Sequence, residues 1–560
     1  MLLAAFLLLL APPAALQGAP AWHGLVDYTK LKSRLGAQTP TGAGVNVSMV
    51  EAPVTSPSGA YYIDPASPEF SSTDDPLGAA VTLHDGSGNA SAGVSSHAQN
   101  NVGAYFFGNV TSVAPGANDI TLYEANHWLG SVIRYTNATG PLEQNFRVQN
   151  HSWVGTTASG NVPPFTEHPD NLKVLRRYDY LIERANDGDG MTAVVGLNNS
   201  SNPLPYLLAH SYNAIGVGRS DGNHSAGLTL SPSTSAYGPG RSKPDIVAPA
   251  GSTSTSTAMV SSAATMLYQT AVAPGAAKNE VMKATLMAGA TKSEFSNWTR
   301  TQVQPLDDMF GAGELNVYNS YLIQYGGRHA GSTAEPTAAV GTYGWDYKEK
   351  VDASNELYYS FEISPGSTAS NLSIVLSWNV NVTDTNPSES VFTPTESLQN
   401  LDLQLYDSTA GFMGTMLDQS ISAVDNVEHI YRTNLGPGTY TLKVSGAANW
   451  DYGLAWRMTT AFDQPTADFD GDGAISGGDF LVWQRNFGKL LGATNSEGDA
   501  DGDGDVDADD LALWKAGAIS PLTPPMLASI AAVPEPATAG MLALTATALL
   551  GARQFRSRRR

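Results

Sequence analysis

The strongest candidate nucleophile in the sequence is Ser254, which lies in the hydroxyl-rich stretch 252–260. An apolar run and a turn with proline and glycine precede this stretch, and the small, helix-favouring residues 261–268 follow it. The pattern predicts a loop that brings a serine to the N-terminus of a helix. There, free backbone N–H groups and the helix dipole would stabilise an oxyanion formed beside the serine. The alternative is a turn that only caps an ordinary helix.

A serine hydroxyl is a poor nucleophile at neutral pH, so it needs an adjacent base and an acid that orients the base. Three polar residues are candidates for the rest of such a site. Glu51 and Asn198 each follow a predicted strand, and His97 opens a helical pattern. We expect them at one edge of a sheet, where the carboxyl ends of parallel strands bind ligands. Taken singly, His97 could instead cap its helix, Asn198 could belong to a turn, and Glu51 could be a surface acid.

The elements that would position these residues are alternating strands and helices. Short apolar runs with strand character alternate with helical patterns over residues 22–330. Such alternation predicts an α/β domain, with a parallel sheet flanked by helices. The predicted strands are residues 45–50, 120–123, 148–153, 191–197 and 214–217.

The order of these motifs resembles that of subtilisin-like serine peptidases, the subtilases. Residues 252–260 align without gaps with the family pattern Gly-Thr-Ser-x-Ala-x-Pro-x-Val and keep its threonine, serine and valine. His97 matches the histidine that opens a helix in this family. The resemblance covers roughly residues 40–325, with further matching segments at 113–116, 214–218 and 311–318.

The resemblance implies a serine endopeptidase that cleaves polypeptide substrates through an acyl-enzyme. Ser254 would attack the peptide carbonyl, and His97 would accept its proton. Glu51 would orient the imidazole, and Asn198 would hold the oxyanion together with the backbone N–H of Ser254.

The sequence departs from the family pattern at several positions. Glu51 replaces an aspartate, while Ser252, Ser256 and Ala258 replace a glycine, an alanine and a proline. Ser256 is a second candidate nucleophile, but it aligns only if two residues are deleted. The nearest alternative acids downstream of Glu51 are Asp64 and Asp74.

Composition limits the remaining classes of function. The chain has 560 residues, of which 42% are hydrophobic, a net charge of −22 and no cysteine. This length predicts two or three folded domains, and the absence of cysteine excludes disulfides and thiolate chemistry. The acidic charge argues against nucleic acid as a partner and favours an exported protein that binds cations.

Residues 345–460 alternate apolar and polar side chains in strand fashion, with Gly, Pro and Asn turns between the strands. This pattern predicts an all-β sandwich. Residues 400–407, 426–429 and 435–442 resemble the jelly-roll domain that follows the catalytic domain of many secreted bacterial peptidases. We expect His429 to be a structural strand residue and not a ligand.

Two acidic loops lie within residues 466–517. Carboxylates at loop positions 1, 3, 5 and 12, glycine at 6 and an apolar residue at 8 suit calcium, because its oxygen ligands converge around a tight turn. Each loop precedes a short helix, and the pair resembles a type I dockerin, which implies two calcium sites and a possible cohesin-like partner. An acidic linker is the alternative. The candidate ligands are Asp468, Asp470, Asp472, Ala474, Ser476 and Asp479 in the first loop, and Asp499, Asp501, Asp503, Asp505, Asp507 and Asp510 in the second.

Both ends of the chain carry predicted export signals. Residues 1–21 contain an apolar stretch followed by small residues, as in a signal peptide. Residues 533–560 combine Val-Pro-Glu-Pro, an apolar segment and a cluster of arginines, which resembles the Pro-Glu-Pro C-terminal sorting signal of exported bacterial proteins. The resemblance implies a protein of the bacterial envelope or cell surface and a membrane peptidase that processes the signal. A plain membrane anchor is the alternative.

Two functions compete with the serine endopeptidase. One is a catalytically degenerate surface protein that keeps the subtilase fold as a binding scaffold. The other is a polysaccharide hydrolase with a dockerin, although no pair of carboxylates stands out against the background of acids.

Overall fold

The computed structural model describes residues 19–71, 80–155, 169–185, 190–201, 203–205, 207–229, 241–386 and 390–518. Most of the predicted signal peptide, the whole sorting signal and Asp74 therefore lie outside the described residues. Within the described part of the chain, no helix is both long and apolar enough to cross a bilayer.

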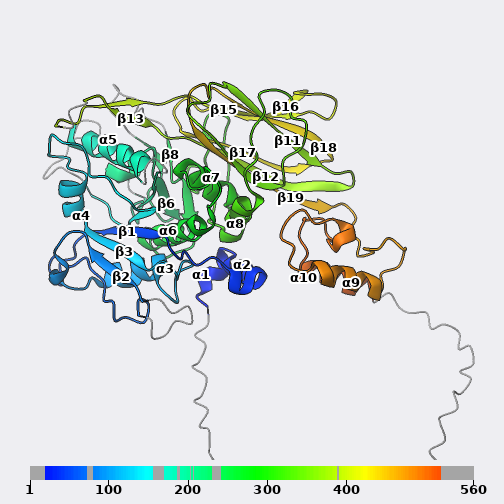
Figure 1. The fold of residues 1–560 in the computed structure, drawn as a ribbon, viewed down its shortest axis with the longest axis horizontal. Helices are drawn as coiled ribbons and strands as arrows, with labels where there is room; N and C mark the ends of the chain where they lie inside the picture. Colours follow the sequence, from blue (N-terminus) through cyan, green and yellow to red (C-terminus); the bar gives the residue numbers. More distant parts are fainter. Residues whose placement is uncertain are drawn as a thin grey trace, which may run out of the picture.

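A seven-stranded parallel sheet forms the centre of the first domain (Figure 1). Its strands are β1 (Asn46–Glu51), β2 (Thr82–Asp85), β3 (Asp119–Glu124), β4 (Val148–His151), β5 (Thr192–Gly196), β6 (Ile215–Arg219) and β9 (Ile246–Ala248). They are arranged in the order β2-β3-β1-β4-β5-β6-β9. Strands β4 and β5 are buried at every position, as expected for a parallel sheet that is covered on both faces. The predicted α/β fold class is confirmed.

The helices of this domain lie on both faces of the sheet. They are α1 (Ala21–Leu25), α2 (Tyr28–Leu35), α3 (Ala104–Phe107), α4 (Ala125–His127), α5 (Pro169–Arg184), α6 (Thr253–Thr270), α7 (Asn279–Gly289) and α8 (Val317–Gly326). Apolar residues of α3, α6, α7 and α8 share one core with β1, whereas α4 and α5 pack on the other face with β5. Every side chain of α6 from Thr253 to Tyr268 is buried, and its small residues allow close packing against the strands.

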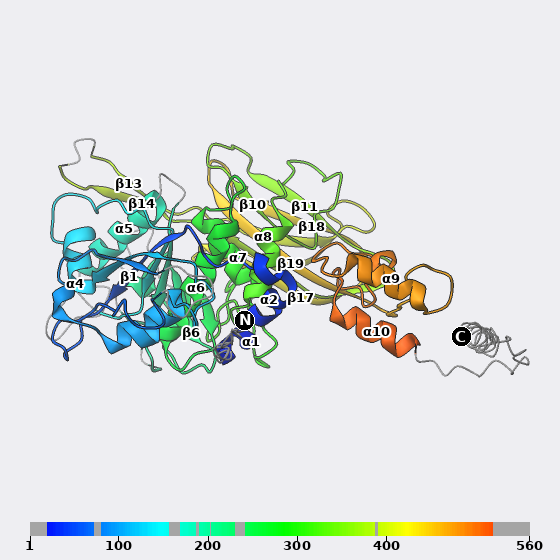
Figure 2. The ribbon, with the colours of Figure 1, turned by 60° about the horizontal axis from the view of Figure 1, so that its bottom comes forward.

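Two antiparallel four-stranded sheets form the second domain (Figure 2). One sheet contains β10 (Tyr343–Lys348), β19 (Tyr452–Phe462), β12 (Ser367–Ser377) and β17 (Val427–Leu435), and the other contains β11 (Glu356–Ile363), β18 (Gly438–Ser445), β15 (Asp402–Asp407) and β16 (Thr415–Ser420). An apolar core that includes Phe361, Leu403 and Trp456 holds them together, so the predicted all-β sandwich is confirmed. His429 is fully buried in β17, with its Nε2 atom 3.3 Å from the Ser373 hydroxyl, as expected for a structural residue.

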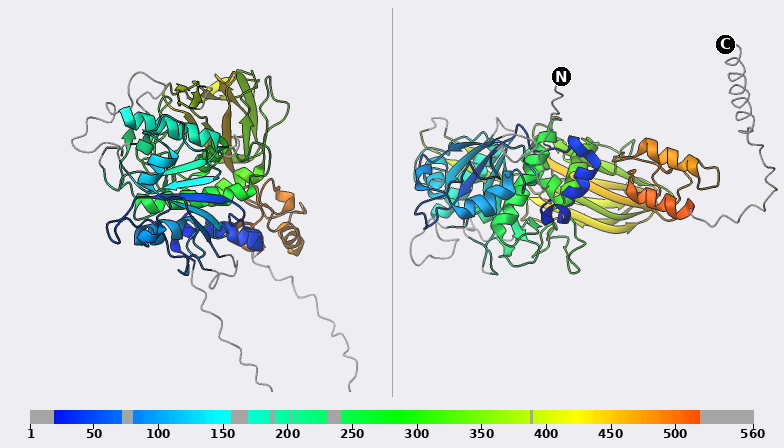
Figure 3. Two further views of the ribbon diagram at one scale, coloured as in Figure 1. Left: turned by 60° about the vertical axis from the view of Figure 1, so that its left-hand side comes forward. Right: turned by 90° about the horizontal axis from the view of Figure 1, so that it is seen from below.

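The two acidic loops and the helices that follow them form a small module beside the sandwich (Figure 3). The helices are α9 (Gly477–Asn486) and α10 (Ala508–Ala518). The buried core of the module consists of only Ala467, Phe469, Trp483, Ala500 and Val506 among the residues that the structure describes. The module also contacts β19, where the Phe462 N–H donates to the Asp501 carbonyl over 2.6 Å.

Three acidic side chains meet where the sandwich contacts the first domain. Glu183 of α5, Glu280 of α7 and Asp451, which precedes β19, line a cavity of about 810 Å³. One carboxylate oxygen of Glu183 and one of Glu280 are buried without a hydrogen-bond partner. Burial, followed by the negative charge of Asp451, raises the pKa of Glu183 to about 7 and also raises the pKa of Glu280. The positive charges of Lys350 beside Glu183 and Lys278 beside Glu280 act in the opposite direction.

We expect this junction to lose stability as the pH rises. Because the pKa of each acid is raised on folding from its ordinary value of 4.5, the stability is fully present below pH 4.5 and is lost as the pH rises through the two raised pKa values, of which that of Glu183 is about 7. Thermal unfolding of the wild type should shift down by roughly 5 °C between pH 5 and pH 9, and Glu280→Gln should reduce this shift. Glu362→Gln, at an exposed position of β11, is the matched control and should leave it unchanged. Equal pH dependence of both variants would contradict the prediction.

Candidate active site

Glu51 ends β1 at the carboxyl edge of the parallel sheet. β1 pairs with β3 on one side and with β4 on the other, so its end is fixed from both directions. The Glu51 side chain is only 2% exposed, and its Oε2 atom accepts a hydrogen bond from His97 Nδ1 over 3.2 Å. Its Oε1 atom is buried without a partner. Glu51 is therefore not the surface acid that one reading of the sequence allowed.

His97 begins the helical segment that leads into α3. The segment is capped by Ser95, whose hydroxyl accepts the N–H of Ala98, and the His97 side chain caps nothing. This leaves the imidazole free for its contact with Glu51. Its side chain is 38% exposed, so Nε2 can face solvent while Nδ1 contacts the buried carboxylate. The hydrogen bond to Glu51 raises the pKa of His97, whereas burial opposes this change. Burial raises the pKa of Glu51, and the hydrogen bond from His97 opposes it.

Ser254 lies in the first turn of α6, as the sequence predicts. The helix is capped by Ser252, whose side chain accepts the N–H of Thr255, so Ser254 is not used as the cap. Its hydroxyl donates to the carbonyl of Ser152 over 3.3 Å, and the Ser152 hydroxyl donates to the carbonyl of Ser254 over 2.9 Å. The Ser254 N–H forms no hydrogen bond with any residue that the structure describes, so it is available to an oxyanion.

Ser256, the second candidate nucleophile, points into the core. It is completely buried, and its hydroxyl donates to the carbonyl of Ala248 over 3.0 Å. Ser254, by contrast, keeps 8% of its surface exposed. Of the two serines, only Ser254 is positioned to reach a substrate.

Asn198 follows β5 and is held through its backbone. Its N–H donates to the Ser225 hydroxyl over 3.0 Å, and its carbonyl accepts the Ser225 N–H over 2.9 Å. The side-chain amide of Asn198 has no hydrogen bond among the described residues, which leaves it able to donate to an oxyanion. The sequence does not single out the neighbouring Asn199, whose Oδ1 atom accepts the N–H and the hydroxyl of Thr253 over 2.7 and 3.1 Å. Asn199 thus ties the end of β5 to the start of α6.

The structure joins Glu51 to His97 directly, and it brings the segment after His97 against α6. No hydrogen bond connects His97 with Ser254 in the described structure, where the serine hydroxyl is turned to Ser152. Catalytic hydrogen bonds often tighten only when substrate is bound. Asp64, an alternative acid, is exposed, and its carboxylate caps a local turn at Ala66.

The acidic loops offer the oxygens that a cation needs. Oxygens of Asp468, Asp470 and Asp479 in the first loop lie within 4.8 Å of one another, and so do those of Asp499, Asp501 and Asp510 in the second. In addition, Asp468 Oδ1 is buried without a hydrogen-bond partner, which fits a bound cation. The glycines at position 6, Gly473 and Gly504, have φ values of 89° and 88°, as the tight turn requires.

The other predicted ligands have different surroundings in the two loops. In the first loop, the Ser476 hydroxyl caps α9 by accepting the N–H of Gly478, and Ala474 can offer only its carbonyl. In the second loop, the side chains of Asp505 and Asp507 contact an arginine. Asp472 and Asp503 turn their Oδ1 atoms to nearby backbone N–H groups of the same loop.

No family model and no curated protein matches this chain. Among solved structures it is similar to the patellamide maturation protease PatA, with 17% identity over 51% of this chain and 98% of that chain, and a TM-score of 0.32. The serine protease MycP1 from Mycobacterium smegmatis is 15% identical over 56% of this chain and 86% of that chain, with a TM-score of 0.32. The pre-peptidase C-terminal domain of collagenase from Bacillus anthracis is 16% identical over 22% of this chain and 98% of that chain, with a TM-score of 0.15.

The contact between Glu51 and His97 can be tested without any assay of activity. Glu51→Gln removes the negative charge beside Nδ1, so the pKa of His97 should fall in an NMR titration of its ring. Glu124→Gln is the control, because Glu124 is paired with Glu51 across β1 and β3 but caps α4 instead. A pKa of His97 that is equal in the wild type and in Glu51→Gln would contradict the contact.

Proposed function

We propose that the protein is a serine endopeptidase that hydrolyses peptide bonds through an acyl-enzyme, with Glu51, His97 and Ser254 as its triad. The hydrogen bond between the buried Glu51 and the half-exposed His97 carries this proposal. A glutamate in this position orients an imidazole whose other nitrogen remains available as a base. The free N–H of Ser254 at the start of α6 gives it further support.

Glu51 accepts the Nδ1–H of His97 and thereby leaves Nε2 unprotonated. When a peptide carbonyl lies beside Ser254, the serine hydroxyl turns away from Ser152, transfers its proton to Nε2, and attacks the carbonyl carbon. The Ser254 N–H and the Asn198 amide donate to the oxyanion that forms. The imidazolium then gives its proton to the leaving amine, and the acyl-enzyme remains on Ser254 until water hydrolyses it.

The accessory parts extend this proposal to an exported enzyme of the bacterial cell surface. The predicted signal peptide would direct export, and a membrane peptidase would process the C-terminal sorting signal. The acidic loops would bind two calcium ions, and the module could contact a cohesin-like partner. Clustered carboxylate oxygens in both loops and the unpartnered Asp468 Oδ1 support the calcium sites.

Replacement of the two candidate serines tests the enzyme. Ser254→Ala should lower the rate of peptide hydrolysis by at least about 1,000-fold and abolish labelling by a serine-directed fluorophosphonate. Ser256→Ala, the matched control in the same helix, should keep both, because its hydroxyl faces the core. A wild-type protein that is folded yet neither hydrolyses peptides nor reacts with the probe would instead favour the catalytically degenerate binding scaffold.

Calorimetry tests the calcium sites. The wild type should bind two calcium ions, and Asp468→Ala combined with Asp499→Ala should abolish binding, because each change removes the first carboxylate of a loop. Asp463→Ala lies just outside the loops and should bind calcium as the wild type does. If the wild type shows no heat of calcium binding, the prediction of calcium sites is wrong and the module is only an acidic segment.

A further inference from the structure

The two acidic loops are copies that differ at specific positions. They share their carboxylates at positions 1, 3, 5 and 12. At positions 7 and 9, however, the first loop has Ala474 and Ser476, where the second has Asp505 and Asp507. The side chain at position 7 is not needed for calcium, because this position offers its backbone carbonyl. The carboxylate of Asp505 at position 7 is therefore available to another partner.

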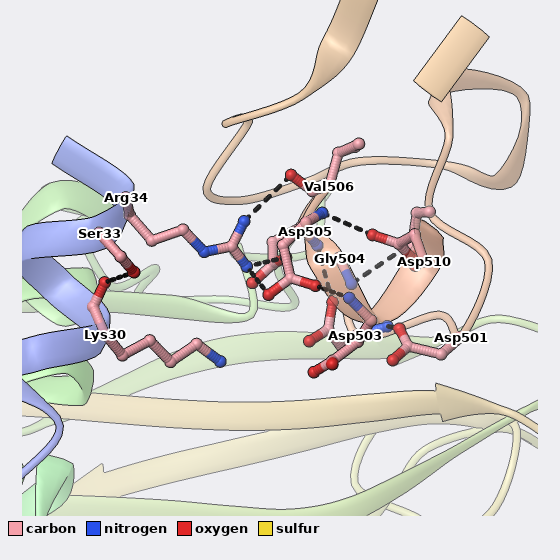
Figure 4. A network of polar contacts seen from close by, with 12 residues as sticks. Lys30, Ser33, Arg34, Asp501, Asp503, Gly504, Asp505, Val506 and Asp510 are labelled. Carbon is pink, nitrogen blue, oxygen red and sulfur yellow. Dashed lines mark hydrogen bonds and ion pairs between the residues drawn. The ribbon is translucent and has the colours of Figure 1, made fainter. Parts of the chain in front are cut away.

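That partner is Arg34, in the last turn of α2 (Figure 4). Its side chain is 5% exposed, and its Nη2 atom contacts the carboxylates of both Asp505 and Asp507. Its Nη1 atom donates to the carbonyl of Val506, which lies between them, over 3.0 Å. Of the three acids that the second loop has and the first lacks, Asp505 and Asp507 hold this guanidinium, and the third, Asp509, is exposed.

The contact is one part of a larger interface with the first domain. The Tyr318 hydroxyl of α8 donates to Asp505 Oδ2 over 3.5 Å. The Lys30 ammonium of α2 lies over the ring of Tyr318, 4.8 Å from its centre. Leu490, which lies between the two loops, belongs to the apolar core of the first domain. The first loop is largely exposed at the equivalent positions. Only the second loop is therefore covered by the first domain.

We propose that the second loop is an intramolecular docking site for the N-terminal helix α2, and that calcium binding by this loop and docking of Arg34 reinforce one another. The second half of this inference rests on the proposed calcium sites. The first half rests on the contacts of Arg34 alone.

The hydrogen bonds within the loop connect the two events. The Asp505 N–H donates to Asp503 Oδ1 over 3.0 Å, and the Asp507 N–H donates to Asp510 Oδ2 over 2.6 Å. The residues that hold Arg34 are thus fixed by the carboxylates that would hold calcium. An ion that orders Asp503 and Asp510 also orders the docking site, and a docked Arg34 lowers the repulsion among the acids of the loop.

The segment that precedes α2 also contributes to a cavity beside the start of α6. Gly24 and Leu25 at the end of α1, and Asp27 directly before α2, line a cavity of about 750 Å³. Pro249, Ala250 and Gly251, which lead directly into Ser252 and the helix of Ser254, line the same cavity. The Asp27 carboxylate is held there by the Asn316 side chain over 2.7 Å. Release of α2 would therefore loosen residues that line the same cavity as the segment before α6.

Hydrogen exchange of the full chain tests the docking. With saturating calcium, Arg34→Met should make the amides of α2 and of residues 500–510 exchange about tenfold faster, while the first loop stays unchanged. Lys32→Met removes an exposed charge from the same helix and should have no effect. Asp505→Ala with Asp507→Ser, which gives the second loop the residues of the first at positions 7 and 9, should reproduce the effect of Arg34→Met on α2. Unchanged exchange of α2 in both variants would overturn the docking.

Calorimetry tests the coupling. Arg34→Met should weaken one of the two calcium sites by roughly tenfold and leave the other unchanged, and the weakened site should disappear in an Asp499→Ala background. Tighter calcium binding in Arg34→Met would show that the two cations repel each other and would overturn the coupling. Absence of calcium binding in the wild type would refute the calcium sites and the coupling together, whereas the exchange of α2 would still decide the docking.

Discussion

The position of the candidate nucleophile depends on the burial of α6 from Thr253 to Tyr268. A helix without an exposed face must pack closely on all sides, and this is possible because its residues are small. Two glycines outside the helix provide space for it: a Cβ atom at Gly196 would lie 2.9 Å from Thr257 Oγ1, and one at Gly42 would lie 2.9 Å from Thr265 Cγ2. With its axis fixed in this way, the first turn of α6 comes to the carboxyl edge of the sheet. The reciprocal hydrogen bonds between Ser152 and Ser254 then join this turn to the end of β4.

The sandwich takes part in the same packing. Val375, Val427 and Ala455 of its strands belong to the apolar core that contains α7 and α8. Gly453 of β19 approaches the backbone of Glu280 so closely that a Cβ atom there would lie 2.4 Å from it. One sheet of the sandwich thus covers helices that would otherwise expose apolar surface. The second domain is part of the core that supports α7 and not a separately attached unit.

Hydrophobic periodicity predicted the sandwich and the parallel sheet, except for the edge strand β2, and it placed Glu51 at the end of a strand. The pairing of Glu51 with His97 followed from the family resemblance. The gapless alignment also favoured Ser254, and the burial of Ser256 agrees with that choice. The sequence could not predict that Ser252 caps α6 or that Asn199 contacts Thr253 in its first turn. Hydroxyl and amide residues are frequent both before α6 and after β5, and only the distances in the structure distinguish them. The side chains of Asp505 and Asp507 were expected to serve calcium, but they contact Arg34, about which the local sequence carries no information.

The contact between Arg34 and Asp505 joins residues that are 471 positions apart. A chain is synthesised from its N-terminus onward, so α2 leaves the ribosome long before its partner in the second loop has been made. Contacts at such a separation close late, because the entropy of the intervening chain must first be lost. Among the described residues, an early helix and a late loop are therefore completed together, and a chain truncated before the second loop would leave Arg34 of α2 without its carboxylate partners.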